Sequence, residues 1–194
     1  AASDVYKRQD FENTGRANRK RRIFLDTETT GMSQATDRIV EVCAIEVDDD
    51  FNEIDSFHAF INPQRKVPWF VTRIHGLNNE FLDDKPIFSD IGRDLLLFLE
   101  GSELWAHNMS FDAGMLNAEF ARNRLPTLEK VDCRLNCTLQ LARSTFPGQK
   151  NSLDALLDRF AIDRSERRLH GAMIDTRLLV KVYQNLVSYR TKTS

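Results

Sequence analysis

The chain has 194 residues, of which 41% are hydrophobic and 29% are charged, and its formal net charge is -2. This length suits one ordinary domain, and the balance excludes both a disordered chain and a membrane-spanning one. The charge excludes a broadly cationic nucleic-acid coat, but not an enzyme that grips one end of a strand. The 3 cysteines are too few, and odd in number, for a disulfide scaffold, which indicates a reducing, cytoplasmic setting.

Residues 1–20 are expected to form a disordered leader. They are polar, show no hydrophobic periodicity and run into the basic stretch RKRR. That stretch is either part of a solvated leader or a phosphate-binding arm. The opening AASDVYKRQ resembles translated adapter sequence, and the apolar core of a signal peptide is missing. We therefore predict a partly non-native leader over 1–20, one folded domain over 21–188 and a C-terminal tail over 189–194.

The strands come first in the chain. A short apolar strand over 23–25 runs straight into Asp26-Thr27-Glu28, and a second apolar strand follows over 39–47. The acidic turn 48–50 leads to a third strand over 54–61, so the pattern predicts a hairpin. Another short strand is expected over 104–106.

Helices are interleaved with the later strands. Ser89 is expected to cap a helix that ends before Gly101, and a second helix should carry 111–120. Asn151 is expected to cap a helix after the break at Pro147, and a last helix should cover 171–187. This order predicts an α/β domain with a mixed central sheet of about five strands flanked by helices, the first strand being central.

Two carboxylates stand together at the end of the first strand. Asp26 and Glu28 are two residues apart, so the period of a strand aims both side chains at one face. Such a pair repels itself unless a cation lies between its members, and hard oxygen ligands suit Mg²⁺ or Mn²⁺. A solvated strand end is the alternative explanation.

Three further residues are candidates by their placement. Asp112 falls in the first turn of a helix, where either the helix dipole explains it or it faces the first two carboxylates. Asp175 shares a helical face with Leu178, and a buried aspartate needs a cation or a hydrogen-bond network. His170 precedes that helix beside Gly171, either as a surface residue or as one that swings over a cleft.

The segments that carry these residues match a known family. FLDTETTG, HNMSFDAGML and LHGAMIDT resemble the three motifs of the DEDDh group of 3′–5′ exonucleases. The resemblance covers 21–188 and implies a ribonuclease H-like fold and cleavage with two divalent metals. FPGQKNSLDAL and LHGAMIDTRLL look most like the proofreading branch, which works beside the catalytic subunit of bacterial DNA polymerase III.

The resemblance also implies roles for individual residues. Asp26, Glu28 and Asp175 would hold the first Mg²⁺ or Mn²⁺ ion, Asp26 would bridge to the second, and Asp112 would support the second. His170 would be the general base, because histidine with an unperturbed pKa of about 6.5 accepts a proton at neutral pH. The residues expected to bind the substrate strand are Asp26, Thr27, Glu28, His75, His107, Asn108 and Asp175.

The expected function is release of nucleoside 5′-monophosphates from a single-stranded or frayed DNA 3′ end during proofreading. Two metals about 4 Å apart would serve the attacking and leaving oxygens. One alternative is a freestanding RNA-trimming exonuclease of the ribonuclease T type. Another is an inactive module that only binds a polymerase, although the intact acidic set argues against it.

Two positions depart from the family pattern. Cys137 stands where the proofreading branch has an acidic residue, and its place at a helix start predicts a lost cap and not a lost metal ligand. Cys133 and Cys137 lack a second Cys/His pair, so zinc is not expected. Phe70 replaces a glutamate thought to touch the substrate, and with Trp69 it either packs under the loop or stacks on a base.

Three arginines, Arg164, Arg167 and Arg168, flank His170. They either hold backbone phosphates of a nucleic acid or form a solvated basic turn. The residue pattern alone favours neither interpretation.

Overall fold

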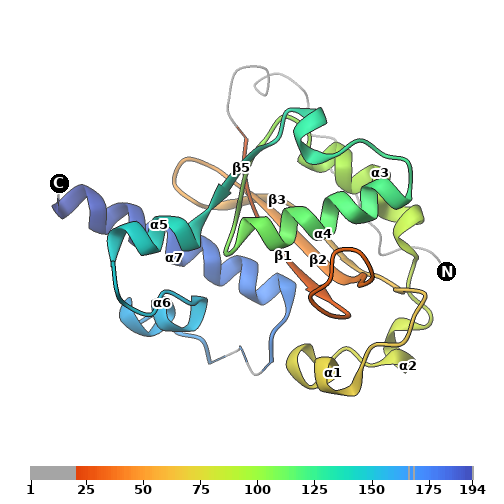
Figure 1. Cartoon of the computed structure of the whole chain (residues 1–194). Coiled ribbons are helices and arrows are strands. Elements are labelled where there is room, and N and C mark those ends of the chain that lie inside the picture. The colour runs from red at the N-terminus through yellow and green to blue at the C-terminus, as the bar shows by residue number, and fades with distance from the viewer. Residues whose placement is uncertain (1–20, 166, 168, 194) are drawn as a thin grey trace.

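A five-stranded mixed sheet in the order β3-β2-β1-β4-β5 forms the centre of the molecule (Figure 1). The computed structural model describes residues 21–165, 167 and 169–193. Strand β2 is antiparallel to β1 and β3, whereas β4 is parallel to β1 and β5. The strands are β1 (Arg22–Thr29), β2 (Ile39–Val47), β3 (Glu53–Phe60), β4 (Glu103–Ala106) and β5 (Arg134–Cys137).

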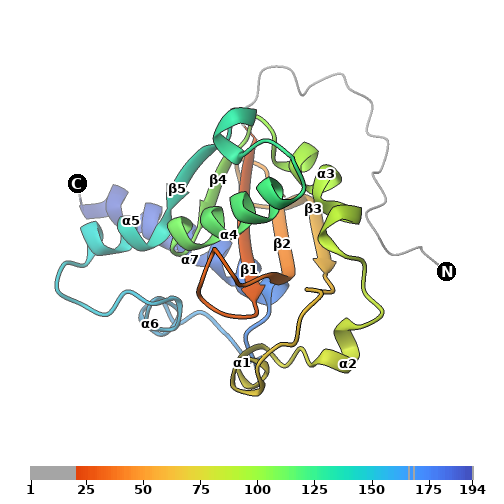
Figure 2. The ribbon, with the colours of Figure 1, turned by 45° about the vertical axis from the view of Figure 1, so that its right-hand side comes forward.

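Helices cover both faces of this sheet (Figures 1 and 2). Helices α3 and α4 pack on one face, and α7 packs on the other with α5 and α6 against it. The helices are α1 (Trp69–His75), α2 (Asn79–Leu82), α3 (Phe88–Leu99), α4 (Met109–Arg122), α5 (Thr138–Thr145), α6 (Leu153–Arg159), α7 (Ala172–Thr193) and the 3₁₀ turn η2 (Leu128–Val131). Within the described residues, none of the helices is long and apolar enough to cross a bilayer.

Strand β1 is buried on both faces because it lies in the middle of the sheet. Leu25 packs with the residues of α3 and α4, and its neighbour Phe24 packs with those of α7. This alternation continues to the end of the strand. Asp26 and Glu28 therefore point toward α7, and Thr27 points toward α4. The C-terminal end of β1 thus carries polar side chains on both faces of the sheet.

The predicted architecture is confirmed: the sheet is mixed, the first strand is central, and β2 and β3 form a hairpin. The last helix was predicted over 171–187, and it extends to Thr193 in the structure. Strand β5 and helices α1 and α2 were not predicted. The predicted leader over 1–20 lies outside the described residues, and the domain limits stay a prediction.

Two predicted helix caps are wrong. Helix α3 begins at Phe88, and the Asp90 carboxylate accepts from the Ile87 N–H at 3.2 Å, so Ser89 lies inside the first turn. The cap of α6 is Ser152, whose hydroxyl accepts from the Ala155 N–H. Asn151 is buried instead, and its amide donates to the carbonyls of the preceding loop because those groups have no strand or helix partner.

Candidate active site

Four carboxylates come together where β1 ends. Asp26 and Glu28 lie in the C-terminal half of that strand. Asp112 lies in the first turn of α4, and Asp175 lies in the first turn of α7. Asp112 and Asp175 are buried, and Asp26 and Glu28 are half-buried. The predicted convergence of Asp112 on the first pair is supported, because the charges of Asp112, Glu28 and Asp175 all act on Asp26.

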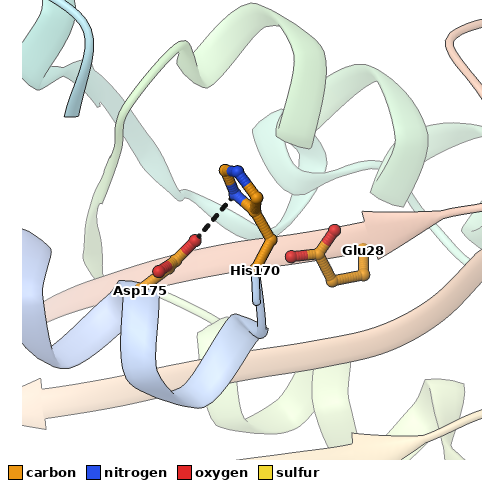
Figure 3. A group of neighbouring side chains, drawn as sticks. All are labelled: Glu28, His170 and Asp175. Carbon is orange, nitrogen blue, oxygen red and sulfur yellow. Dashed lines mark ion pairs between the residues drawn. The ribbon is translucent and has the colours of Figure 1, made fainter. Parts of the chain in front are cut away.

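Glu28, His170 and Asp175 form a close group of possible metal ligands (Figure 3). Each offers one ligand atom within 4.8 Å of the other two. The Nδ1 atom of His170 is 3.3 Å from Oδ2 of Asp175, and the imidazole is half-exposed. The backbone N–H of His170 donates to the Ile74 carbonyl at 3.1 Å, so helix α1 fixes the histidine at the mouth of the site.

Asp112 approaches the site from the opposite face of β1. Its Oδ1 accepts the hydroxyl of Thr27 at 2.8 Å, and both side chains are buried. The hydroxyl of Thr27 therefore gives its proton to Asp112. The predicted contact of Thr27 with the substrate strand stays a prediction.

The electrostatics of the cluster favour a bound cation. Burial, and after it the charges of Asp175 and Glu41, together raise the pKa of Glu28 to about 8. Burial, followed by the neighbouring Asp112 and Glu28 charges, holds the pKa of Asp26 well above its ordinary value. Burial also raises the pKa of Asp112. Carboxylates that resist ionisation together are relieved by a cation, and their oxygens are the ligands that Mg²⁺ and Mn²⁺ prefer, so the residues fit a divalent metal.

Glu41 belongs to the site and was missed by the sequence interpretation. It lies opposite Glu28 in the β1–β2 register, and it is buried. One of its oxygens accepts the backbone N–H of Ala172 at 3.1 Å, and the other contacts Nε2 of His58 at 2.8 Å. Glu41 thus joins the sheet to the first turn of α7, which carries Asp175. A glutamate in the middle of the apolar strand IVEVCAIEV was the available signal.

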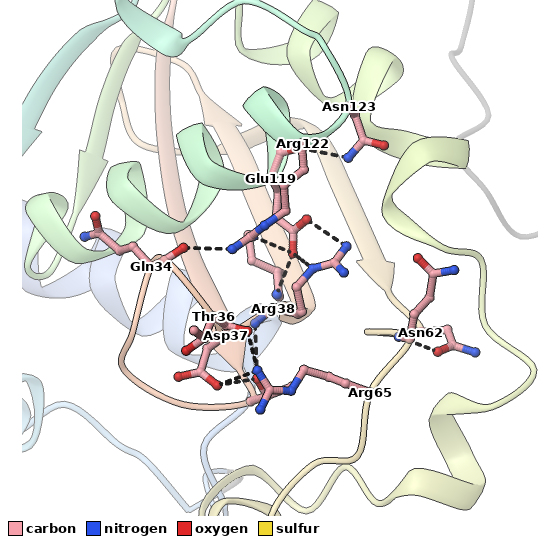
Figure 4. A network of polar contacts seen from close by, with 12 residues as sticks. Gln34, Thr36, Asp37, Arg38, Asn62, Arg65, Glu119, Arg122 and Asn123 are labelled. Carbon is pink, nitrogen blue, oxygen red and sulfur yellow. Dashed lines mark hydrogen bonds and ion pairs between the residues drawn. The ribbon is translucent and has the colours of Figure 1, made fainter.

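A second polar network fixes the loop that follows Glu28 (Figure 4). Arg38 donates two hydrogen bonds to the buried carboxylate of Glu119, at 2.7 and 3.0 Å. Arg122 lies 3.6 Å from the same carboxylate, and Arg65 lies 3.2 Å from Asp37. These contacts tie residues 30–38 to α4, so the strand end that carries Asp26 and Glu28 is held rigidly.

The predicted substrate histidines have different environments. His75 is buried, its Nδ1 accepts from the Leu77 N–H, and within the described residues its Nε2 has no hydrogen-bond partner. Burial lowers the pKa of His75, which favours the neutral imidazole, while the backbone of Thr29 acts in the opposite direction. His107 instead contacts Thr138 at 2.9 Å and the Asn151 carbonyl at 3.0 Å. Both of its nitrogens are used inside the protein, so its contacts do not support the predicted role at the substrate.

The remaining sequence candidates lie at the starts of α1, α4 and α5. Asn108 is exposed and holds a left-handed backbone at φ 93° just before α4, and a non-glycine residue rarely adopts this conformation unless its position is functional or tightly constrained. Trp69 and Phe70 are both exposed on α1, so the packing alternative for this pair is wrong. Cys137 caps α5 without a side-chain hydrogen bond, as predicted, and all three cysteines are free.

Comparison with known proteins identifies the class of this site. The RNase T exonuclease family model matches residues 23–183. The chain therefore belongs to that exonuclease family, as the three motifs predicted. The DNA polymerase III subunit epsilon of Rickettsia conorii is 46% identical over 177 residues, which are 88% of this chain and 75% of the relative. That of Buchnera aphidicola from Acyrthosiphon pisum is 43% identical over 171 residues, 86% of this chain and 72% of the relative. By these relationships the protein is a 3′–5′ exonuclease of the epsilon type.

Solved structures agree on the fold. Exonuclease I superposes with a TM-score of 0.76 over 87% of this chain and 41% of its own, at 19% identity. Exonuclease X, in complex with 5′ overhanging duplex DNA, superposes with a TM-score of 0.64 over 86% of this chain and 91% of its own, at 27% identity. The ribonuclease H-like exonuclease fold predicted from the motifs is confirmed.

Proposed function

We propose that this exonuclease removes nucleoside 5′-monophosphates from the 3′ end of DNA, with Asp26, Glu28, Asp112 and Asp175 holding two Mg²⁺ or Mn²⁺ ions and His170 acting as general base. The observation that carries the proposal is the convergence of these carboxylates from β1, α4 and α7 beside one half-exposed histidine. When bound, the metals would supply Lewis-acid stabilisation to the attacking and leaving oxygens of the phosphodiester.

The chain's own residues organise the proton transfer. Asp175 can accept a hydrogen bond from Nδ1 of His170, since the two atoms lie 3.3 Å apart. This contact orients the imidazole and leaves Nε2 to take the proton of the attacking water. Glu41 supports both groups, because its hydrogen bond to the Ala172 N–H holds the start of α7 against the sheet.

Nε2 of buried His75 makes no hydrogen bond of ordinary geometry within the described residues, so it could donate to a hydroxyl or phosphate oxygen of the terminal nucleotide. The exposed rings of Trp69 and Phe70 on α1 offer faces on which bases can stack. These groups favour a single-stranded or frayed 3′ end, because a base must leave its duplex partner before an aromatic ring can stack on it.

The relatives also suggest the setting. Both are named as DNA polymerase III subunits, which favours DNA as substrate, proofreading as the task and the polymerase catalytic subunit as partner. The three free cysteines agree with the reducing cytoplasm that we predicted. The RNA-trimming and inactive alternatives have no comparable support.

A degradation assay with matched oligonucleotides tests the proposal. DNA and RNA strands of one sequence, each with and without a terminal mismatch, are incubated with the protein and Mg²⁺, and the released products are identified by mass spectrometry. We expect 5′-monophosphates from DNA, faster release at a mismatched end and loss of activity in excess chelator. Faster degradation of RNA, or activity that survives the chelator, would contradict the proposal.

A further inference from the structure

The segment between α6 and α7 places an arginine on the carboxylate of Asp175. Nη2 of Arg167 donates to Oδ2 of Asp175 at 2.9 Å, and Nε donates to the other oxygen of the same carboxylate. Only 8% of the Arg167 side chain is exposed, so this two-bond pair is shielded from water. Both oxygens that the proposed function assigns to a metal are therefore occupied by guanidinium N–H groups.

The same guanidinium engages the proposed base. Nη2 of Arg167 lies 2.9 Å from Nδ1 of His170. A guanidinium can only donate, so Nδ1 accepts and the proton of a neutral imidazole must be on Nε2. In this tautomer His170 cannot donate to Asp175 through Nδ1, and its Nε2 cannot take a proton from water. The contact is incompatible with general-base catalysis.

Arg167 also has an anchor outside the metal site. Its Nη1 donates to Oδ1 of Asp154 on α6, and the Asp154 side chain is half-exposed. Arg164, in the same segment, pairs at 2.8 Å with Asp154 and with Asp158. If the Arg167 guanidinium leaves Asp175, it keeps the Asp154 carboxylate as a partner close to solvent. Its positive charge is therefore not left buried and unpaired.

One guanidinium does not balance this site. Four carboxylates converge there from β1, α4 and α7, whereas Arg167 brings a single positive charge and pairs with only one of them, Asp175. A divalent ion carries twice the charge and accepts carboxylate oxygens directly. Exchange of the guanidinium for a divalent ion is thus electrostatically favourable, but the ion must first break the pair with Asp175.

We propose that Arg167 is a resident cation that competes with the divalent metal for Asp175 and holds His170 in its inactive tautomer until the metal displaces it. This inference rests on the metal site of the proposed function. It predicts that the metal-free enzyme is closed by Arg167, and that metal entry frees Asp175 and His170 together. The apparent dissociation constant for metal is then raised by the reciprocal of the open fraction.

Calorimetric titration of the protein with Mn²⁺, in the absence of DNA, measures this competition. If Arg167 is paired with Asp175 in nine molecules out of ten, Arg167→Ala should tighten the apparent Mn²⁺ affinity by about tenfold. Arg167→Gln, which keeps most of the packing volume, should tighten it as well if the alanine variant folds poorly. Arg164→Ala is the matched control: it removes a guanidinium from the same segment and from Asp154, and it should leave the affinity within about twofold.

The tautomer of His170 gives a second measurement. Nitrogen-15 NMR of the metal-free protein should show the proton of the His170 imidazole on Nε2, and saturating Mg²⁺ should move it to Nδ1. In Arg167→Ala the Nδ1 tautomer should be present before Mg²⁺ is added. A merely structural arginine would alter stability without moving this proton.

The outcomes separate this inference from the proposed function. If the wild type binds Mn²⁺ and both Arg167 variants bind it no more tightly, the competition is wrong while the metal site stands. If the wild type binds no Mn²⁺, or if Asp175→Asn leaves Mn²⁺ binding unchanged, the proposed function itself is wrong.

Discussion

Helix α4 carries a buried carboxylate near each end, and the two have opposite environments. Glu119 accepts two hydrogen bonds from Arg38 and a third from the Ile39 N–H. Asp112 accepts the hydroxyl of Thr27 and faces the carboxylates of β1 and α7. The charge of Glu119 is paired with Arg38, whereas the Asp112 carboxyl has a raised pKa.

The difference separates structural from functional acidic residues. A buried carboxylate with its own arginine stabilises the fold only while the pair is intact. A group of buried carboxylates with raised pKa values is costly to the fold, and a bound cation offsets that cost. Equal burial thus gives no guide to function, whereas the partners of the carboxylate do.

Replacing Asp26 should lower activity strongly while it spares the fold. Asp26→Asn removes one charge from the cluster, and loss of metal stabilisation worth about 4 kcal/mol would lower the rate by about 10³-fold. Nuclease kinetics measure the loss of rate, and a melting curve of the metal-free protein measures stability. The substitution relieves carboxylate repulsion, so the melting temperature should stay the same or rise. Asp94→Asn, on the exposed side of α3, is the control. A melting temperature that drops with activity would mean that Asp26 is structural, like Glu119.

His170→Ala should lower turnover by roughly 10²–10⁴-fold, the usual contribution of a general base. Mn²⁺ affinity should hardly change, because we assign the metals to the carboxylates. Single-turnover kinetics and a Mn²⁺ titration on the same variant measure the two properties, and added imidazole should restore part of the rate. Loss of metal binding in this variant would make His170 a ligand.

Glu119→Ala should act on stability. Its removal leaves Arg38 without the partner of two hydrogen bonds, and breaking a buried pair costs about 3 kcal/mol or more. Urea unfolding should show this loss, with near-normal Mn²⁺ affinity in the protein that remains folded. Asp84→Ala, which breaks the exposed pair with Lys85, should change stability by less than about 1 kcal/mol. A variant as stable as the wild type would remove the distinction between the two carboxylates of α4.

The metal-free protein should lose stability as pH rises. Glu28 has a pKa of about 8 in the folded chain against an ordinary value of 4.5, so folding favours its protonated form. That stabilising contribution is complete below pH 4.5 and disappears as pH rises through about 8. Urea unfolding across this range should show the fall, and saturating Mg²⁺ or the substitution Glu28→Gln should reduce it. A metal-free stability that rises over the same pH range would contradict the raised pKa.

The smallest expected effect is at Cys137. Helix α5 has Cys137 at its cap position, where no side-chain hydrogen bond is made. Asn136 precedes this position, and its amide N–H groups donate to the Leu104 and Arg134 carbonyls. Cys137→Asp should supply an acceptor and stabilise the protein by about 1 kcal/mol. Denaturation curves and a Mn²⁺ titration test this together. Tighter metal binding without a gain in stability would place Cys137 in the active site.

The sequence motifs predicted the acidic cluster because its members lie at the ends of regular elements. Asp26 and Glu28 follow an apolar strand, and Asp175 shares a helical face with Leu178, so periodicity predicted the direction of these three. For Asp112 the residue pattern left the helix dipole as an alternative. The family resemblance then supplied their roles. The order of strands and helices was sufficient for the sheet, because a strand buried on both faces belongs at its centre.

The features that were missed depend on contacts distant in sequence. Glu41 meets Ala172 from another element, and the pairing of Arg167 with Asp175 requires the loop before α7 to fold back. Strand β5 has only 4 residues and an exposed Arg134, so it shows no apolar alternation. Helix α1 keeps large apolar side chains in solvent, which hides the amphipathic pattern that a packed helix would show.

The chain order of the ligands also has a kinetic consequence. Asp26 lies on the first described strand and Asp175 on the last helix, so the site depends on the docking of α7 against β1 and β2. During synthesis from the N-terminus, the sheet can form before α7 has left the ribosome. A nascent chain would then hold Asp26, Glu28 and Asp112 without Asp175 or His170. On the proposed assignment, a chain whose α7 has not yet docked lacks the fourth carboxylate and the general base, so it should not degrade DNA.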